Sequence, residues 1–504
     1  MTLSNKKIVF ILPLLIGIFS SFSLPPYNYY LINFISFPLL LIHLIQNHKY
    51  GKFRLFCIGW IFGFGYFISN IYWLTNSLTF DKSFIIFIPF ALFLVPLFLG
   101  LFYGLASLCC GFFNFGKKFS SLLIFCIFFS ITEYLRGLFF GGFPWNLISY
   151  SLSEILELIQ ILAFVGTYTF NLLIITFFSL PALLFFDHGR NIKLFISVFS
   201  ILIIISNFVL GRFTIENFNN FENKKLNFTI KLVSPEIEIS RFLDFTDPID
   251  TIINLIDISD PNPIEKTLFI FPEGIIPNIE LHDLKNYKDI FSKKYSTNHK
   301  IILGMTSIEK NQIFNSLVLI DNNTNLLYKY KKNKLVPFGE FLPFENFLGK
   351  VGLKKITSGY QSFSAANTRN IMTINGLNFL PLICYEIIYS GRIGNKQEYD
   401  FILNISEDGW FGKTVGPHQH FAHSIFRSIE EGKNLIRSTN NGISAVIDPK
   451  GQVIDYIMSQ GVIEMKTFKT VENTLFKNHG NTIFFYFLFI YITLTAFLKL
   501  RENK

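Results

Sequence analysis

Long apolar runs are the feature that most limits what this chain can fold into. Eight of them are uninterrupted or nearly so, and each reaches roughly the 17–25 residues that a helix needs to cross about 30 Å of hydrocarbon. They cover residues 8–24, 30–46, 55–75, 84–106, 120–140, 158–185, 193–210 and 481–499. The sequence therefore predicts a multi-span α-helical membrane domain with about eight transmembrane helices.

Composition separates a membrane part from a polar part. Half of the 504 residues are hydrophobic and 16% are charged, whereas soluble globular chains are roughly 25% charged. Most of the Asp, Glu, Lys and Asn residues lie between 212 and 480. We expect a membrane domain with seven helices over 1–211, a soluble domain over 212–480, and a last transmembrane helix with a short cytoplasmic tail over 481–504.

Basic residues predict the orientation of the chain in the membrane. Lys and Arg concentrate in alternate connections between the spans, and connections rich in these residues stay on the cytoplasmic side. The residues are Lys6, Lys7, Lys49, Lys52, Arg54, Lys117, Lys118, Arg190, Lys193, Lys499, Arg501 and Lys504. Both termini are then cytoplasmic, and the 212–480 domain lies outside. The first run alone also fits a signal peptide, but the spans that follow favour an uncleaved anchor.

The polar domain alternates between strand-like and helix-like segments. The predicted strands are 228–233, 266–271, 300–304, 379–383, 401–405, 435–439 and 443–447, together with a hairpin of 315–320 and 326–330. The predicted helices are 247–258, 279–295 and 417–434, the first with Asp247 as its N-cap. This mixture favours α/β layers over an all-β sandwich.

Three of these strands are followed by reactive side chains. Glu273 follows the strand 266–271, a group of lysines follows the hairpin, and Cys384 follows the strand 379–383. A carboxylate can accept a thiol proton, and a cation can hold an oxyanion, so the three groups are the parts of a covalent acyl-transfer site. The residues alone leave the lysine open, and the candidates are Lys329, Lys331, Lys332 and Lys334.

Each of these groups also has a simpler interpretation. Cys384 is a small apolar side chain that suits a buried strand end, and the carboxylate and the lysine suit a solvated surface. Cys384 is nevertheless the one cysteine between 212 and 480, whereas exported domains usually carry paired cysteines. An internal disulfide in this domain is therefore excluded.

Several longer motifs carry a family resemblance. They are FPEG at 271–274, YKYKKNKLVPFGEFLP at 328–343, LPLICYE at 380–386 and the run from NISEDGWFG to DPKG at 404–451, with LPPYNYY at 24–30, EYLRG and GGFPWN at 133–146 and GTYTFN at 166–171 in the membrane part. The sequence resembles the nitrilase superfamily, and within it the bacterial apolipoprotein N-acyltransferases. This resemblance implies an α-β-β-α sandwich for the domain on the periplasmic side of the inner membrane.

The resemblance also implies a set of site residues. It points to a catalytic triad of Glu273, Lys332 and Cys384, because the family places its lysine eight residues before the glutamate of VPFGE. That glutamate, Glu340, corresponds to a second carboxylate that assists the site. Tyr385 and Glu386 follow the nucleophile, as in the family, and count as supporting residues.

Substrate contacts are less clearly marked in the sequence. The family often carries a Trp in the arm that follows the first strand of this domain, whereas the segment here offers Phe242. Trp410 and Phe411 are either substrate contacts or parts of a packed turn. Arg136 fits a lipid phosphate or an interfacial anchor, and Trp145 fits an aromatic belt at the membrane surface.

The implied activity is acyl transfer in lipoprotein maturation. A fatty acyl chain would pass from a phospholipid, expected to be phosphatidylethanolamine, through a Cys384 thioester to the α-amino group of the diacylglyceryl-cysteine of an apolipoprotein. The implied partners are these two substrates and the bilayer, with no nucleic acid and no cofactor. His418, His420 and His423 are interpreted as a polar helix face and not as metal ligands.

Two other functions remain open at this point. A membrane-tethered amidase or nitrilase would use the same triad with water as the second nucleophile. A transporter with an external binding domain is disfavoured, because few ionisable residues lie in the middle of the spans, where ion pathways place them.

Overall fold

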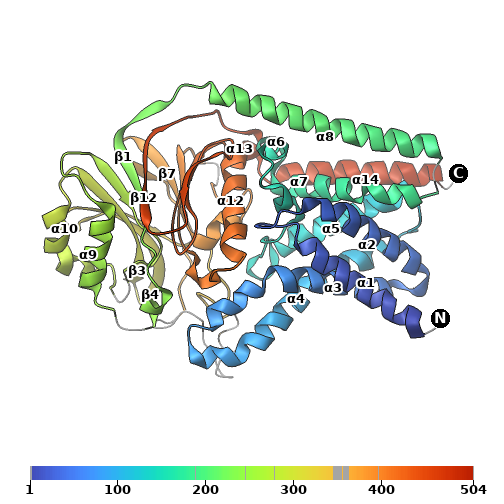
Figure 1. Ribbon diagram of the computed structural model, residues 1–504, viewed down its shortest axis with the longest axis horizontal. Coiled ribbons are helices and arrows are strands. Elements are labelled where there is room, and N and C mark those ends of the chain that lie inside the picture. Colours follow the sequence, from blue (N-terminus) through green and yellow to red (C-terminus); the bar gives the residue numbers. More distant parts are fainter. Residues whose placement is uncertain are drawn as a thin grey trace. The chain divides into compact units, whose positions relative to one another are not determined.

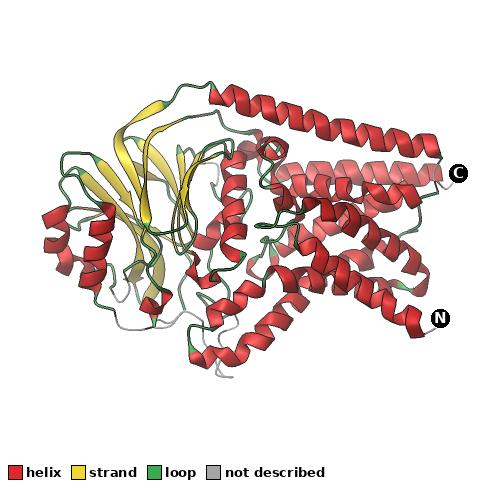
Figure 2. Cartoon of the chain, in the orientation of Figure 1, coloured by secondary structure: helices red, strands yellow, loops and turns green. Residues whose placement is uncertain are grey.

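The computed structural model describes residues 3–187, 189–243, 246–276, 279–343, 345, 355, 362–394 and 397–502. The chain forms two units, which are drawn in Figures 1 and 2. The helical unit comprises Met1–Thr75, Ile86–Asn219 and Thr474–Lys504, and the sheet unit comprises Asn76–Ile85 and Asn220–Asn473.

The helical unit is built from long apolar helices. Its elements are α1 (Leu3–Ser21), α2 (Asn33–Asn47), α3 (Lys52–Asn70), α4 (Ile88–Cys110), α5 (Phe119–Arg136), α6 (Leu156–Ile159), α7 (Leu162–Ser179), α8 (Arg190–Asn219), α13 (Leu475–His479) and α14 (Thr482–Glu502). Seven helical segments among the described residues are long and apolar enough to cross a membrane. The first predicted span corresponds to α1, of which Ile8–Ser21 is a shorter apolar segment.

Glycines bring α3 and α4 into direct backbone contact. A Cβ atom on Gly63 of α3 would lie 2.8 Å from the Cα atom of Gly100 on α4, and a Cβ atom on Gly100 would lie 2.9 Å from the backbone nitrogen of Phe64. Larger residues would force the helices apart. The small-residue pairs Gly59/Gly63 and Gly100/Gly104 therefore serve close helix packing.

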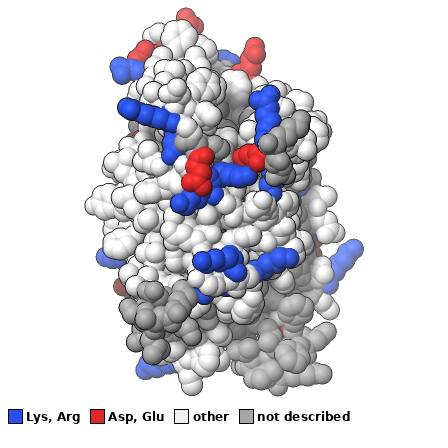
Figure 3. Space-filling view, turned by 90° about the vertical axis from the view of Figure 1, so that its right-hand side faces the viewer, with Lys and Arg blue, Asp and Glu red and all other residues white. Residues whose placement is uncertain are grey.

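The end of the helical unit that carries both chain termini is basic. Figure 3 views this end and shows blue Lys and Arg side chains, with fewer red Asp and Glu side chains among them, spread across a largely uncharged face. Lys499 and Arg501 occupy the last turn of α14, and α3 begins at Lys52. Arg190 begins α8.

The unit boundaries differ from those expected from hydropathy. The helix α8 continues past residue 211 to Asn219, and the helical unit resumes at Thr474, before residue 481. Phe476 of α13 packs against Gly166 of α7, where a Cβ atom would lie 1.9 Å from its ring. The apolar runs end before the helices do, because polar residues can continue a helix that tertiary packing already stabilises.

The sheet unit contains two six-stranded sheets. Its elements are β1 (Lys224–Ser234), α9 (Pro248–Ser259), β2 (Thr267–Ile270), α10 (Lys288–Lys294), β3 (His299–Glu309), β4 (Gln312–Asp321), β5 (Leu326–Lys331), β6 (Met372–Ile374), β7 (Leu377–Ile383), β8 (Phe401–Glu407), α12 (Gly416–Glu431), β9 (Asn434–Asn440), β10 (Ser444–Ile447), β11 (Val453–Ile457) and β12 (Gly461–Phe468).

The two sheets have matching strand patterns. The first runs β12-β1-β2-β3-β4-β5, and the second runs β11-β10-β9-β8-β7-β6. In each, three neighbouring strands are parallel, namely β1, β2 and β3 in the first and β7, β8 and β9 in the second. Ser438 of β9 donates hydrogen bonds to the carbonyls of Val233 on β1 and Ile270 on β2, so the sheets face each other. Together with the helices outside the strands in Figure 2, this is the α-β-β-α sandwich.

The helix α9 begins where the sequence predicts. The side chain of Asp247 accepts a hydrogen bond from the backbone N–H of Ile249 at 2.9 Å, and Pro248 follows at the first helical position. The predicted helix over 279–295 is instead a short 3₁₀ turn followed by the seven-residue helix α10. The remaining predicted strands all have counterparts among the elements of the sheet unit.

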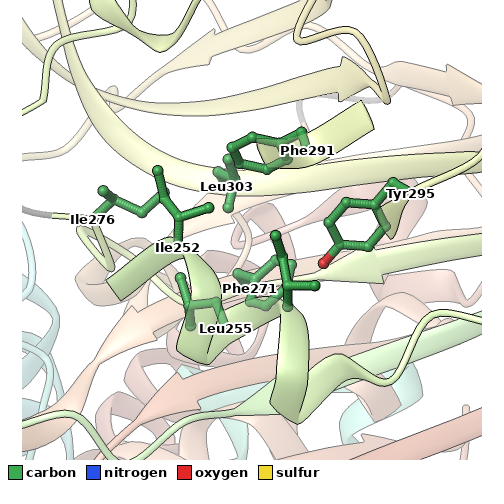
Figure 4. A pocket seen from close by; sticks show the side chains of 8 residues that line it. Ile252, Leu255, Phe271, Ile276, Phe291, Tyr295 and Leu303 are labelled. Atoms are coloured by element: carbon green, nitrogen blue, oxygen red, sulfur yellow. The ribbon is translucent and has the colours of Figure 1, made fainter. Parts of the chain in front are cut away.

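A tightly packed apolar core supports the strand that leads to Glu273. Phe271 and Leu303 meet side chains of α9 and α10, among them Ile252 and Phe291, as Figure 4 shows. The space that remains between them is only about 10 Å³. This is close to the size of one water molecule and has apolar walls, so it is a packing void and not a site for an acyl chain.

Candidate active site

The predicted reactive groups lie just after the C-terminal ends of three strands. Glu273 lies three residues beyond the end of β2, Lys332 directly follows β5, and Cys384 directly follows β7. The strands β2 and β5 belong to the first sheet and β7 to the second. The sandwich therefore assembles the site from both of its sheets.

Lys332 is the lysine that reaches the carboxylates. Its Nζ lies 3.1 Å from Oε1 of Glu273 and 2.9 Å from Oε1 of Glu340, and the side chain is 1% exposed. Burial alone would lower the pKa of Lys332, but the negative charges of Glu273 and Glu340 outweigh burial and hold this pKa well above its usual value. The ammonium group is therefore a permanent charge in the site.

The other candidate lysines point elsewhere. Lys329 and Lys331 both form ion pairs with Glu309, the second at 2.9 Å. They are two residues apart on β5, so their side chains leave the strand on the same face. Lys334 is exposed. The structure thus distinguishes Lys332 from the three neighbouring lysines, which the sequence alone left as candidates.

Glu273 is held at both carboxylate oxygens. Oε1 accepts hydrogen bonds from Lys332 and from Nδ2 of Asn315, the latter at 2.7 Å, and Oε2 accepts from the backbone N–H of Glu407 at 3.0 Å. The side chain is largely buried. Gly304 of β3 allows this placement, because a Cβ atom there would lie 2.5 Å from the Cα atom of Glu273.

Cys384 occupies a strained turn at the end of β7. Its φ of +50° is in the left-handed region, which is uncommon for a residue with a side chain, and a 3₁₀ turn begins at the same residue. Such strain clusters at functional sites. The residue is 8% exposed, so its thiol is largely shielded from solvent.

The surroundings of Cys384 keep its thiol protonated at rest. Burial is the largest cause that raises its pKa well above the usual value, and the charge of Glu273 adds to the effect, while Lys332 opposes it. A side-chain hydrogen bond with Ser406 of β8 also lowers this pKa. A protonated thiol is a poor nucleophile, so Cys384 can act as one only where a base removes its proton.

Glu340 shares the lysine with Glu273. Its Oε1 accepts from Lys332 and from Asn315, and its Oε2 accepts from the backbone N–H of Val336 at 2.8 Å. The side chain is largely buried. Glu340 therefore lies in the same hydrogen-bonded group as Glu273 and Lys332.

Glu386 links the turn at Cys384 to the segment that follows Lys332 through hydrogen bonds. It accepts hydrogen bonds from the backbone N–H groups of Ile383, Asn333 and Lys334. Burial would raise the pKa of Glu386, but the guanidinium group of Arg369, at 2.8 Å, lowers it below the usual value. This buried carboxylate thereby fixes the position of Cys384 relative to Lys332. Tyr385 is buried and packs edge-to-face on Tyr389.

A second ionic group, centred on Asp408, also acts on Cys384. Asp408 accepts from Ser406 at 2.7 Å and from Arg437 at 2.7 Å, and its Oδ1 lies 3.0 Å from Nδ1 of His420. All four side chains are fully buried. His420 and His423 are therefore buried parts of α12 and do not form the polar face that the sequence predicts.

Aromatic residues extend from Glu273 across the loop after β8. Phe242 stacks on Trp410 at 5.5 Å, and Phe80 contacts Trp410 edge-to-face at 5.8 Å. The ring of Phe242 also lies 3.0 Å from where a Cβ atom of Gly274 would be. Phe411 packs on His420. Phe80 comes from the connection after α3, which is why this connection belongs to the sheet unit.

Arg136 and Trp145 lie inside the helical unit. Arg136 is 1% exposed, donates to the carbonyl of Phe143 and faces Glu133 at 3.8 Å. Trp145 is 2% exposed and packs against Trp73 and Phe143. Trp145 is thus a packed loop residue, and the prediction of an aromatic belt position is wrong.

Several residues of the site carry no signal in the sequence. Asn315, Arg369 and the buried ion pair of Arg241 with Glu407 become visible only when the strands are placed side by side. Arg241 also donates to the carbonyl of Gly274. Among the described residues, no group of three or more His, Cys, Asp or Glu side chains has the arrangement of a metal site.

Matches to known proteins cover most of the chain. Residues 16–180 match the family model of the apolipoprotein N-acyltransferase N-terminal domain, and residues 244–461 match that of carbon-nitrogen hydrolases. Among solved structures, a CN-hydrolase superfamily protein from Xanthomonas campestris is 15% identical with a TM-score of 0.34, over 49% of this chain and 91% of that chain.

Curated relatives cover both units. The apolipoprotein N-acyltransferase of Brucella melitensis biotype 1 is 30% identical over 457 residues, which are 87% of this chain and 85% of the relative. That of Rhizobium rhizogenes is 31% identical over 471 residues, which are 89% of this chain and 87% of the relative. The chain therefore belongs to the apolipoprotein N-acyltransferases, membrane enzymes with a nitrilase-like domain.

Proposed function

We propose that this acyltransferase works through a covalent thioester on Cys384, with Glu273 as base and Lys332 as the fixed positive charge. The observation that carries the proposal is the contact of Lys332 Nζ with Glu273 Oε1 at 3.1 Å inside a buried group that also acts on the Cys384 thiol. The proposed base, cation and nucleophile therefore interact electrostatically with one another.

The first half-reaction acylates the enzyme. Glu273 takes the proton of Cys384 while the sulfur attacks the sn-1 ester carbonyl of a phospholipid, for which we propose phosphatidylethanolamine. Lys332 and backbone N–H groups after Cys384 stabilise the oxyanion that forms. When the intermediate collapses, Glu273 returns the proton to the alcohol oxygen, and the lysophospholipid leaves.

The second half-reaction transfers the acyl group to nitrogen. The α-amino group of a diacylglyceryl-modified N-terminal cysteine attacks the thioester, and Glu273 accepts a proton from the amine. The sulfur then leaves and is protonated again. A thioester suits this step, because sulfur is a better leaving group than an alkoxide at the same position. The buried position of Cys384 helps to exclude water, which would otherwise hydrolyse the intermediate.

Aromatic residues beside Glu273 suit the apolar substrates. We propose that Phe242 and Trp410 form one wall of the route by which an acyl chain reaches Cys384, and that both rings contact this chain. The stacking of the two rings at 5.5 Å supports this. Arg136 acts through the protein instead, since its buried guanidinium group holds the carbonyl of Phe143 and with it the loop that contains Trp145.

We propose that both termini are cytoplasmic and that the 212–480 domain is periplasmic. The basic end of the helical unit in Figure 3 supports this orientation. Alkaline phosphatase fused after Gly480 should be active, and the same enzyme fused after Lys504 should be inactive. The reverse pair of results would contradict the proposed orientation.

Mass spectrometry of the full-length enzyme tests the covalent mechanism. After incubation with phosphatidylethanolamine vesicles and no acceptor, the peptide that contains Cys384 should carry one fatty acyl group. Neutral hydroxylamine should release this group, and a diacylglyceryl lipopeptide should discharge it. Cys384→Ser should lose lipopeptide turnover and can retain a stable acyl ester. An unacylated Cys384 in enzyme that still modifies the lipopeptide would refute the thioester, and release of fatty acid to water without lipopeptide product would indicate a hydrolase.

A further inference from the structure

Asn315 of β4 lies between the two buried carboxylates of the proposed site. Its Nδ2 donates to Oε1 of Glu273 at 2.7 Å and to Oε1 of Glu340 at 2.8 Å. We infer that Asn315 is a positioning residue that holds Oε1 of Glu273 and directs the thiol proton to its Oε2. This inference deepens the function proposed above and rests on it.

The count of hydrogen bonds on Glu273 supports this assignment. An ionised carboxylate offers about four acceptor positions, two on each oxygen. Oε1 accepts from Lys332 at 3.1 Å and from Asn315 at 2.7 Å, which fills it. Oε2 accepts from the backbone N–H of Glu407 at 3.0 Å and keeps one position for a further donor. The proton that leaves the sulfur of Cys384 therefore binds Oε2, while the S–H bond breaks and the new S–C bond forms.

A neutral amide suits the place that Asn315 occupies. Two carboxylates share one ammonium group at this site, so the group as a whole is negatively charged. The two hydrogens of Nδ2 serve one carboxylate each and add no charge. A second cation would instead attract the carboxylates more strongly and weaken Glu273 as a base.

The backbone of Asn315 also reaches the lysine. Its carbonyl oxygen accepts the N–H of Lys332 at 2.8 Å. The register of β4 and β5 pairs Ser316 with Lys331 and extends to this bond. One residue therefore contacts the lysine through its backbone and both carboxylates through its side chain.

Other charged groups face the same site and stay unchanged in an Asn315 variant. Lys355 acts electrostatically on Glu340, and Asp408 acts on Cys384. Glu407 is paired with Arg241. A change in pH dependence on substitution of Asn315 therefore reports the loss of its two donated hydrogen bonds.

Two variants of nearly equal size test the role. Asn315→Leu removes both donors, and Asn315→Asp places acceptors where the donors were. A carboxylate that loses a donor is protonated at higher pH, so the acid limb of Cys384 acylation by phosphatidylethanolamine vesicles should move up by about one pH unit in Asn315→Leu. It should move in the same direction and further in Asn315→Asp. At high pH the rate of Asn315→Leu should approach that of the wild type.

A matched control and a double variant complete the experiment. Asn311→Asp makes the same chemical change at an exposed position with φ +62°, which Asp tolerates, and should leave the pH profile unchanged. Asn315→Leu combined with Glu273→Gln should be no slower than Glu273→Gln alone. An unshifted acid limb in both Asn315 variants, or an equal loss of rate at every pH, would overturn the inference. Full acylation of Cys384 in Glu273→Gln would instead overturn the proposed triad itself.

Discussion

Replacement of Gly304 by Ala tests whether the position of Glu273 controls acylation. Gly304 lies on β3 opposite Leu317 of β4, and its N–H donates to the carbonyl of Pro272 at 3.2 Å. A Cβ atom at this position would lie 2.5 Å from Cα of Glu273 and 2.8 Å from the backbone nitrogen of Gly274. These are backbone atoms, so no change of rotamer can relieve the contact.

The expected size of the effect follows from the displacement. Carbon atoms in contact are about 3.5–4.0 Å apart, so the backbone around Glu273 has to move by roughly 1 Å. A displacement of about this size can lower a catalysed rate by about 10²-fold. Overpacking also costs about 1–3 kcal/mol of unfolding free energy, which leaves the protein folded if its stability is typical.

The assay is a single-turnover measurement of Cys384 acylation from phosphatidylethanolamine vesicles by the full-length enzyme. Gly461→Ala is the control, since its Cβ atom would lie 3.4 Å from the Ile457 side chain and its φ is not positive. We expect wild-type acylation for Gly461→Ala and a loss of about two orders of magnitude for Gly304→Ala at comparable membrane content. A wild-type rate in Gly304→Ala would refute the link between the position of Glu273 and acylation.

Three further predictions address the charges around the site. Lys332→Ala should lower the acylation rate by about 10²–10³-fold, whereas Lys331→Ala, which loses its ion pair with Glu309 and its contact with the Phe314 ring, should leave it unchanged; equal rates in the two variants would exclude Lys332 from the mechanism. In Glu273→Gln, the rate at which iodoacetamide alkylates Cys384 should keep rising with pH above about pH 8.5, which is the usual thiol pKa. The reason is that burial, which the substitution leaves in place, is the main cause of the raised pKa of Cys384. A rate that levels off below that pH would contradict the role of burial. Arg241→Met should destabilise the sheet unit by about 3–5 kcal/mol in thermal unfolding, because it leaves Glu407 buried without its partner, and adding Glu407→Gln should recover part of the loss; an additive loss would contradict the pairing.

Local patterns in the sequence were sufficient for the architecture. Runs of apolar residues mark the membrane helices, because each helix has to be apolar along its own length. Alternation of strands and helices marks the α/β layers, and the N-cap of α9 follows from the adjacent residues Asp247 and Pro248. The position of Glu273 and Cys384 after strand ends is also local information. The ends of α8 and of the helical unit were not predictable in this way, because packing extends those helices beyond their apolar residues.

The tertiary structure decided which polar groups meet. Four lysines close together in the chain are chemically alike, but strand geometry sends Lys329 and Lys331 to Glu309 and leaves Lys332 to reach Glu273. Asn315 lies 42 residues from Glu273 in the chain and contacts it because only β3 lies between β4 and β2, the strand that leads to Glu273. Arg241 and Glu407 are 166 residues apart and form a buried pair across the two sheets. Such contacts depend on strand order and on the packing of one sheet against the other, and neither is encoded in the spacing of residues along the chain.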